Sequence, residues 1–163
     1  MPAPAHSPLP YSDDALRRLI ADQVSMPGAL LPILHRVQEH FGHVPAQAVP
    51  IIAKELSLSR AEVHGVVTFY HDFREAPAGK HVVKLCQAEA CQAMGVAEIT
   101  GYAERRLGVK LGDTRADGKV TLEPVYCLGL CACSPAALVD GQPVGRINRK
   151  RLDTLAHDLG VAQ

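Results

Sequence analysis

The chain has 163 residues, of which 47% are hydrophobic, so it is long enough and apolar enough to bury a core. Its 17 basic and 17 acidic side chains give a net charge of zero. This balance argues against binding to nucleic acid or to an anionic membrane surface, because both usually need a basic surplus. No apolar run approaches the roughly 20 residues of a membrane-spanning helix.

The first segment of the chain, MPAPAHSPLPYSDD, has neither the basic nor the apolar region of a signal peptide. Four prolines among its first ten residues predict a flexible, extended leader over residues 1–11. We therefore expect a cytoplasmic chain in a reducing compartment, where disulfides are rare. Five cysteines then need another explanation, and ligation of a metal or an iron–sulfur cluster is the commonest one.

Residues 12–75 are predicted to form a small helical bundle, since short helices joined by short loops are typical of one. Ser12 can cap the first helix, and two aspartates follow it at the positive end of the helix dipole. Pro45 is expected to end the second helix. Ser59 and Glu62 have the spacing of a capping box at the start of another.

Residues 79–163 alternate between strand and helix patterns. GKHVVKLC predicts a strand that ends at Cys86, and ADGKVTLEPVYC predicts an Asp-Gly turn and a strand that ends at Cys127. The helix between them is expected to end at Gly108. AALVDGQPVGRI predicts a hairpin around its Asp-Gly pair. A last helix begins after Asn148, and this order predicts an α/β sandwich of thioredoxin-like type.

The buried faces of the helices are predicted from apolar residues at steps of three and four. In the bundle they are Leu30, Leu34, Val37 and Phe41, then Val49, Ile52 and Leu56, then Val63, Val66 and Tyr70. In the second half they are Val96, Ile99, Ala103 and Leu107, then Leu152, Leu155 and Leu159.

Four of the five cysteines form two pairs at the ends of the predicted strands. Four residues separate Cys86 from Cys91, and three separate Cys127 from Cys131. If the two strands are neighbours in one sheet, both loops lie at the same rim of the domain and the four thiolates converge there.

The spacing of these cysteines allows more than one kind of site. Structural zinc sites favour two to four residues between paired ligands around one ion. A two-iron cluster takes two thiolates on each iron and suits wider loops. The pattern C-x4-C with C-x3-C therefore favours a [2Fe–2S] cluster, while zinc and a set of redox-active or unligated thiols stay open as alternatives.

Residues near the cysteines suggest how a cluster would be supported. Gly129 is expected to let the backbone approach an inorganic sulfide, and the helix that starts near Gly95 directs its positive end to the site. Cys133 is the surplus thiol, and we interpret it as a small buried residue. A cis bond before Pro135 is conceivable.

The cysteine segments resemble those of a known family. KLCQAEACQAMG and VYCLGLCACSPAALVDG, with the upstream EVHGVVTFYHDF, resemble the thioredoxin-like [2Fe–2S] subunit of respiratory complex I over residues 15–160. The resemblance implies that one [2Fe–2S] cluster is held by Cys86, Cys91, Cys127 and Cys131. It implies a thioredoxin-like ferredoxin domain over residues 79–163, preceded by the helical bundle.

The resemblance also implies a function as a one-electron relay that is not catalytic by itself. The partner would be an NADH-binding flavoprotein subunit that carries FMN and, through it, a larger catalytic subunit. Within the family, the compact length and the CLGLCACSPAA segment look most like the gamma subunit of soluble, NAD-dependent, molybdenum-containing formate dehydrogenase. Complex I and NAD-reducing hydrogenase are the alternatives, and a zinc-stabilised interaction domain is a remote one.

Other candidate residues carry weaker signals. The chain has no GxGxxG or GxxxxGK[ST] segment that would bind the phosphates of NAD. The eight histidines include no HExxH pair and are interpreted as surface residues, although His81 opens a strand and is a candidate for tuning a cluster. Glu89 is expected to be solvated, and the basic run RINRKR to be the exposed start of the last helix.

Overall fold

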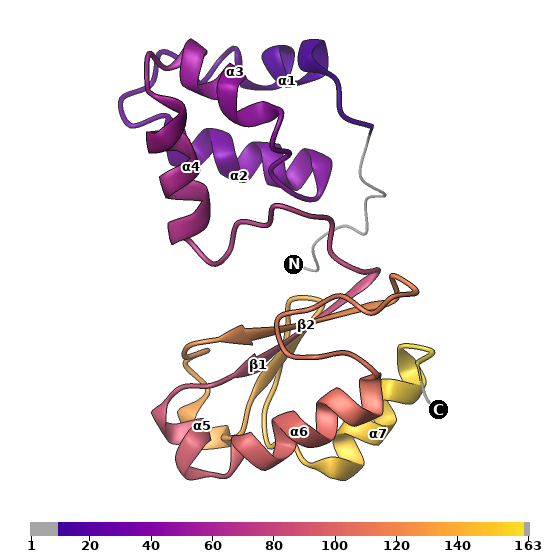
Figure 1. The fold of residues 1–163 in the computed structure, drawn as a ribbon. Helices are drawn as coiled ribbons and strands as arrows, with labels where there is room; N and C mark the ends of the chain where they lie inside the picture. The colour runs from indigo at the N-terminus through magenta and orange to yellow at the C-terminus, as the bar shows by residue number, and fades with distance from the viewer. Residues whose placement is uncertain (1–9, 162–163) are drawn as a thin grey trace. The chain divides into compact units, whose positions relative to one another are not determined.

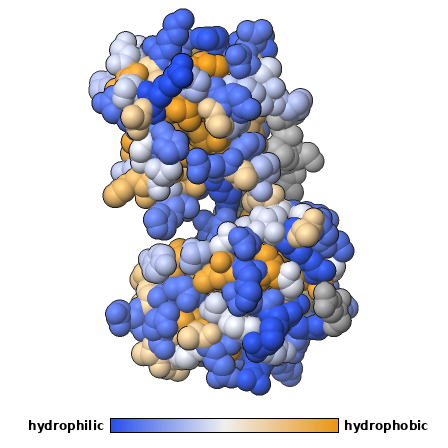
Figure 2. Space-filling view, in the orientation of Figure 1, coloured by the Kyte–Doolittle hydropathy of each residue, from blue (hydrophilic) through white to orange (hydrophobic). Residues whose placement is uncertain are grey.

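The computed structural model describes residues 10–161, so the expected leader over residues 1–11 lies almost wholly outside the described residues. The chain divides into two compact units, His6–Pro77 and a second that begins at Ala78 (Figure 1). Each unit has its own apolar core. Polar residues cover most of the visible face of both units, with apolar patches among them (Figure 2). None of the described helices has the length and hydropathy that a membrane crossing requires.

The described part of the first unit, from residue 10 on, contains four helices. They are α1 (Asp13–Ile20), α2 (Leu30–Phe41), α3 (Ala48–Glu55) and α4 (Arg60–Phe69). The hydroxyl of Ser12 accepts the N–H of Ala15 at 3.2 Å and so caps α1 as predicted. At the start of α4, Ser59 accepts the N–H of Glu62 at 3.2 Å and donates its own N–H to the Glu62 carboxylate at 2.7 Å, which confirms the capping box.

These helices pack around a core to which each contributes one apolar stripe. The fully buried larger residues of this core are Leu16, Ile20, Ile33, Leu34, Val37, Phe41, Val44 and Ile52. Two details differ from the predictions. α2 ends at Gly42, before Pro45, because Gly42 is left-handed (φ 77°) and its N–H bonds to the carbonyl of Gln38. In α4 the buried residues are Val63 and Val67, whereas Tyr70 lies beyond the helix end in an extended conformation and is exposed.

The second unit is built on a four-stranded sheet with the order β2-β1-β3-β4. The strands are β1 (His81–Cys86), β2 (Val120–Val125), β3 (Ala137–Val139) and β4 (Gln142–Val144). β1 runs parallel to β2 and antiparallel to β3. In the parallel register Cys86 lies opposite Val125. The chain therefore leaves β1 and β2 at the same edge of the sheet.

Three helices complete this unit: α5 (Glu89–Ala93), α6 (Val96–Leu107) and α7 (Arg149–Asp158). α6 and α7 lie side by side against the sheet (Figure 1). Asp153 of α7 links them, because its carboxylate accepts hydrogen bonds from the Tyr102 hydroxyl at 2.8 Å and from Arg106 Nε at 2.7 Å. The core between sheet and helices contains Val83, Leu85, Leu107, Val120, Leu122, Ile147 and Leu152.

The hairpin between β3 and β4 turns at Asp140 and Gly141, both with positive φ, as the Asp-Gly pair predicted. The Asp140 carboxylate accepts the N–H of Val82 at 2.8 Å and contacts the His81 ring at 2.8 Å. His81 is thus held at the start of β1, five residues and roughly 16 Å of strand away from Cys86. At this distance His81 does not contact the cysteines, which argues against a tuning role for it.

The chain around the cysteines contains three features that the sequence did not predict. β2 ends at Val125, two residues early, because Cys127 takes a left-handed conformation (φ 75°) that a strand does not allow. Helix α5 follows β1 within four residues. Cys131–Cys133 forms a short 3₁₀ helix, η1. The bond between Ser134 and Pro135 is cis, which was conceivable from the sequence.

Candidate metal centre

The first cysteine pair is buried at the end of β1. Cys86 is its last residue and Cys91 lies on α5, with side chains 3% and 2% exposed. The two thiols are near enough to influence each other's ionisation. Between them, Gln87 donates its backbone N–H to the carbonyl of Val125 at 2.8 Å and its side-chain amide to Thr100 Oγ1 at 3.1 Å. The first loop is therefore attached both to the neighbouring strand and to α6.

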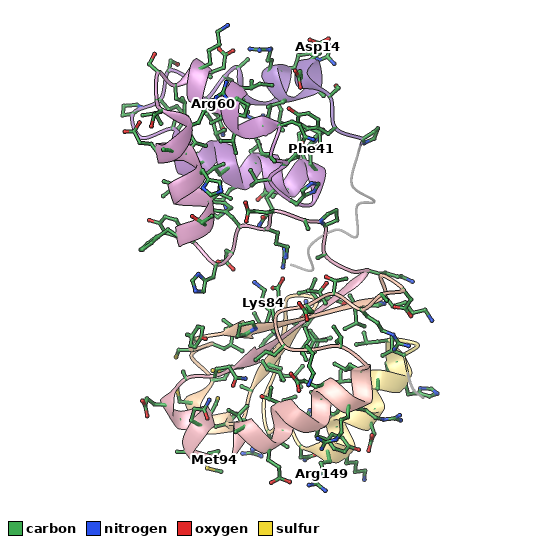
Figure 3. The ribbon with its side chains drawn as sticks, viewed as in Figure 1. Asp14, Phe41, Arg60, Lys84, Met94 and Arg149 are labelled. Carbon is green, nitrogen blue, oxygen red and sulfur yellow. The ribbon has the colours of Figure 1, made fainter. Side chains whose placement is uncertain are left out.

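The second pair lies at the surface. Cys127 follows β2 by two residues and Cys131 begins η1, and both are exposed. The Cys127 thiol is near enough to Cys131 to influence its ionisation. Large, exposed side chains flank both pairs. Tyr126 precedes Cys127 and is 66% exposed. Met94, which follows α5 and is labelled in Figure 3, is 61% exposed.

Hydrogen bonds connect the two pairs across the sheet edge. The backbone N–H groups of Cys127 and Leu128, on the second loop, donate to the sulfur of Cys86. The backbone N–H of Ala136 does the same for the sulfur of Cys91. The charges of Cys86 and Cys91 also raise the pKa of Cys131. All four thiols thus converge at one edge of the sheet, as the predicted adjacency of the strands requires.

The thiols differ in how readily they ionise. Burial alone raises the pKa of Cys86, but the N–H groups of Ala88, Cys127 and Leu128 and the Cys91 thiol outweigh it, so its pKa lies below the usual value. Burial and the adjacent Cys86 raise the pKa of Cys91. The Cys127 thiol raises the pKa of Cys131. Cys86 is therefore the thiol that this environment prepares as a thiolate, which is the form that binds metal.

The arrangement discriminates between the kinds of site that four thiols can form. A tetrahedral zinc site needs all its ligands around one point. A two-iron cluster instead takes a pair of thiolates at each iron. Two thiol pairs at one sheet edge fit the two-iron cluster, with Cys86 and Cys91 buried and Cys127 and Cys131 exposed.

Gly129 has a conformational role in its loop, and its expected approach to an inorganic sulfide stays a prediction. A Cβ at this position would meet nothing within 4 Å, so no close approach of protein atoms requires glycine. Its φ is 72°, a left-handed value that glycine adopts without strain. Gly129 is thus needed for the backbone path between Cys127 and Cys131.

Several residues near the thiols differ from the predictions, and others agree with them. α6 begins directly after Gly95, as predicted, whereas the short helix α5 that contains Cys91 was not predicted. Cys133 is half-buried in η1, where a fully buried residue was expected. Glu89 is exposed, as predicted. In the basic run, Arg149 pairs with Glu98 and stacks on Tyr102 (Figure 3).

Three supporting residues were not predicted from the sequence. Gln87 and Thr100 attach the first loop to α6, and Ser134 Oγ donates to the carbonyl of Cys131 at 2.5 Å. Gln87 and Ser134 are next to cysteines in sequence, which was the available signal. Thr100 lies 13 residues after Gln87, so only the fold reveals their contact.

Comparisons with known proteins agree with this geometry. The model of the thioredoxin-like [2Fe–2S] ferredoxin family matches residues 16–160. A subunit of the NADH-quinone oxidoreductase of Pseudomonas aeruginosa is 37% identical over 119 residues, which are 73% of this chain and 72% of that protein. The HndA subunit of the NADP-reducing hydrogenase of Solidesulfovibrio fructosivorans is 29% identical over 147 residues, covering 88% of this chain and 85% of that subunit.

A solved structure supports the same family assignment. The crystal structure of an NAD⁺-reducing [NiFe]-hydrogenase superposes with a TM-score of 0.69 at 27% identity and covers 85% of this chain. The present chain spans about a quarter of that longer chain, 24% of its length. The resemblance seen in the cysteine motifs, the thioredoxin-like fold and the presence of one [2Fe–2S] cluster are thereby confirmed. This chain belongs to the thioredoxin-like [2Fe–2S] ferredoxin family.

Proposed function

We propose that Cys86, Cys91, Cys127 and Cys131 hold the cluster and that the chain is an electron-transfer subunit of an NADH-linked complex. The observation that supports this most strongly is the convergence of two thiol pairs, joined by N–H bonds from one loop to the other pair. When bound, a [2Fe–2S] cluster accepts and releases electrons one at a time. The buried pair anchors the cluster in the fold, and the exposed pair brings it to the surface where a partner can approach.

Iron analysis and visible absorption test the site directly. We expect a reddish-brown protein with two iron atoms for each chain, the composition of a [2Fe–2S] cluster. A colourless protein that holds one zinc ion would instead support a zinc-stabilised interaction domain. A colourless protein without metal, but with a reactive thiol of low pKa, would support a thiol–disulfide enzyme.

The partner in this proposal is an NADH-binding flavoprotein subunit that carries FMN, with a larger catalytic subunit beyond it. The names of the relatives support an NADH-linked complex, since they include an NADH-quinone oxidoreductase subunit and a pyridine-nucleotide-reducing hydrogenase subunit. The sequence of this chain has no glycine-rich phosphate-binding motif, in keeping with NAD and FMN on a separate subunit. We propose the helical unit as a docking element, because no cysteine lies in it and the aromatic side chains of Phe69 and Tyr70 are exposed at the end of α4.

For the parent complex we propose a soluble, NAD-dependent formate dehydrogenase, in which this chain is the gamma subunit. The CLGLCACSPAA segment and the compact length support this assignment. The relatives are named for NADH-quinone oxidoreductase and for hydrogenases, and these complexes are the alternatives. Affinity purification of the chain from its native cells, with mass spectrometry of the bound polypeptides, decides the question. A molybdenum-containing formate dehydrogenase subunit would support the proposal, and quinone-reducing or [NiFe] subunits would contradict it.

A further inference from the structure

The segment that joins β4 to α7, residues 145–147, binds the loop that carries the second cysteine pair. Arg146 donates its backbone N–H to the carbonyl of Cys133 at 2.6 Å. Ile147, whose side chain is buried in the core, donates its N–H to the carbonyl of Pro135 at 2.8 Å. The part of the loop that directly follows Cys131 is therefore attached to the core through this segment.

The close approach of the two segments depends on the small size of Gly145. A Cβ added at Gly145 would lie 2.6 Å from the Cβ of Cys133 and 3.1 Å from its carbonyl oxygen. Such distances force one of the two backbones to move. Gly145 does not have a left-handed φ, so the restriction is one of space alone. Gly129 is restricted for the opposite reason, because a Cβ there would meet no atom within 4 Å but its φ is left-handed.

A displacement of Cys133 would be passed on to Cys131. Within η1 the N–H of Cys133 bonds to the carbonyl of Leu130 at 2.8 Å. Ser134 bonds to the carbonyl of Cys131 twice, through its N–H at 3.3 Å and its hydroxyl at 2.5 Å. These bonds join residues 130–134 into one tight turn, so Cys133 cannot move without moving Cys131.

We propose that Gly145 and Cys133 form a size-matched contact that sets the position of Cys131. Gly145 is then a positioning residue for the cluster, and the surplus cysteine acts through its Cβ and backbone, with no role for its sulfur. This inference rests on the proposed function, because it takes Cys131 as a cluster ligand. The orientation of a ligand influences the reduction potential and the hold on the metal.

The test uses the full-length protein with its cluster and the variant Gly145→Ala. We expect a shifted electron paramagnetic resonance spectrum of the reduced cluster and a shifted midpoint potential. Iron should pass to a chelator at least about tenfold faster, the scale typical of losing a group that orients a metal ligand. Adding Cys133→Gly removes the clashing Cβ and should return the spectrum towards that of the original protein. Adding Cys133→Ala keeps the Cβ and should not.

A second glycine provides a matched control for general destabilisation. A Cβ at Gly79 would lie 2.9 Å from the backbone of Val120, a clash of similar kind. Gly79 precedes β1, at the opposite end of the sheet from the cysteines. Gly79→Ala should lower the free energy of unfolding and leave the spectrum and potential unchanged. Equal spectral shifts in Gly79→Ala and Gly145→Ala would overturn the inference.

The remaining outcomes separate this inference from the ligand assignment. If Cys131→Ser has the original spectrum, the ligand assignment fails and this inference fails with it. If the spectrum of Cys131→Ser is altered but that of Gly145→Ala is not, this inference alone fails. If Gly145→Ala does not fold, Gly145→Ala with Cys133→Gly should recover a folded protein with its cluster, and failure of that pair to fold would also overturn it.

Discussion

The backbone N–H of Cys127 donates a hydrogen bond to the sulfur of Cys86, a residue 41 positions earlier in the chain. The bond is possible because β1 and β2 are parallel neighbours, with Cys86 opposite Val125. The left-handed conformation of Cys127 then turns its loop towards the first pair. An N–H bond to a ligand sulfur stabilises negative charge there and is one of the factors that determine the potential of an iron–sulfur cluster.

Replacement of single cysteines by serine should divide the five into two groups. We expect Cys86→Ser, Cys91→Ser, Cys127→Ser and Cys131→Ser each to lose the cluster or to change its spectrum severely, because each removes a thiolate from one iron. Cys133→Ser should keep both the iron content and the spectrum. Iron per chain and visible absorption of the five purified variants measure this. A colourless Cys133→Ser protein beside an unchanged Cys91→Ser protein would overturn the ligand assignment.

Gly129→Ala should destabilise the protein without a steric clash. The φ of 72° costs a residue with a Cβ about 1–2 kcal/mol, while the space beside Gly129 is open. We expect urea unfolding to show a loss of that size and the folded variant to keep its iron. Gly129→Asn should lose less stability than Gly129→Ala, since asparagine tolerates left-handed conformations better than alanine. Equal losses for the two variants would show that φ is not the cause.

The capping box of α4 should make stability depend on pH. The N–H and hydroxyl of Ser59 hold the pKa of the Glu62 carboxyl below its usual value. Because the pKa of Glu62 is lower in the folded state than in the unfolded state, its carboxylate stabilises the fold at pH values above the usual glutamate pKa. This stabilisation is lost as the pH falls through the pKa that Glu62 has in the folded state. Glutamine can keep the bond to the Ser59 N–H but carries no charge.

Glu62→Gln should therefore be less stable than the original protein at neutral pH, and the difference should vanish in acid. Urea unfolding, followed by circular dichroism over a series of pH values, measures the difference. Glu62→Ala serves as a control, because it loses the hydrogen bond as well and should stay less stable in acid. A difference between Glu62→Gln and the original protein that grows as the pH falls would contradict this assignment.

Removal of residues 1–77 should leave a folded fragment with its cluster. The four cysteines and the core around Val83, Leu122 and Leu152 all lie after Ala78, and the helical unit has a separate core. We expect the fragment to keep the original visible spectrum and to bind partner subunits more weakly, as measured by co-purification. Full assembly of the fragment would contradict the docking role of the helical unit, and loss of colour would show that the cysteines depend on it.

Local signals in the sequence determined where several helices begin, where one hairpin turns and which kinds of site the cysteines can form. Helix caps act within a few residues, so Ser12, Ser59 and Asn148 marked their helices correctly. The Asp-Gly pair at 140–141 determined the hairpin for the same reason. The two cysteine spacings narrowed the chemistry to a few kinds of site, because a metal or cluster restricts which short loops can supply its ligands.

Only the tertiary structure decided which of these elements meet. The parallel pairing of β1 with β2 brings the two thiol pairs together, and it depends on contacts between residues far apart in the chain. The same packing explains three other relationships. They are the bond from Gln87 to Thr100, the hydrogen bond from residues 145–147 to Cys133 and the separation of His81 from the cysteines. Such contacts leave no periodic trace in a single sequence, because each needs only a suitable residue at two distant positions.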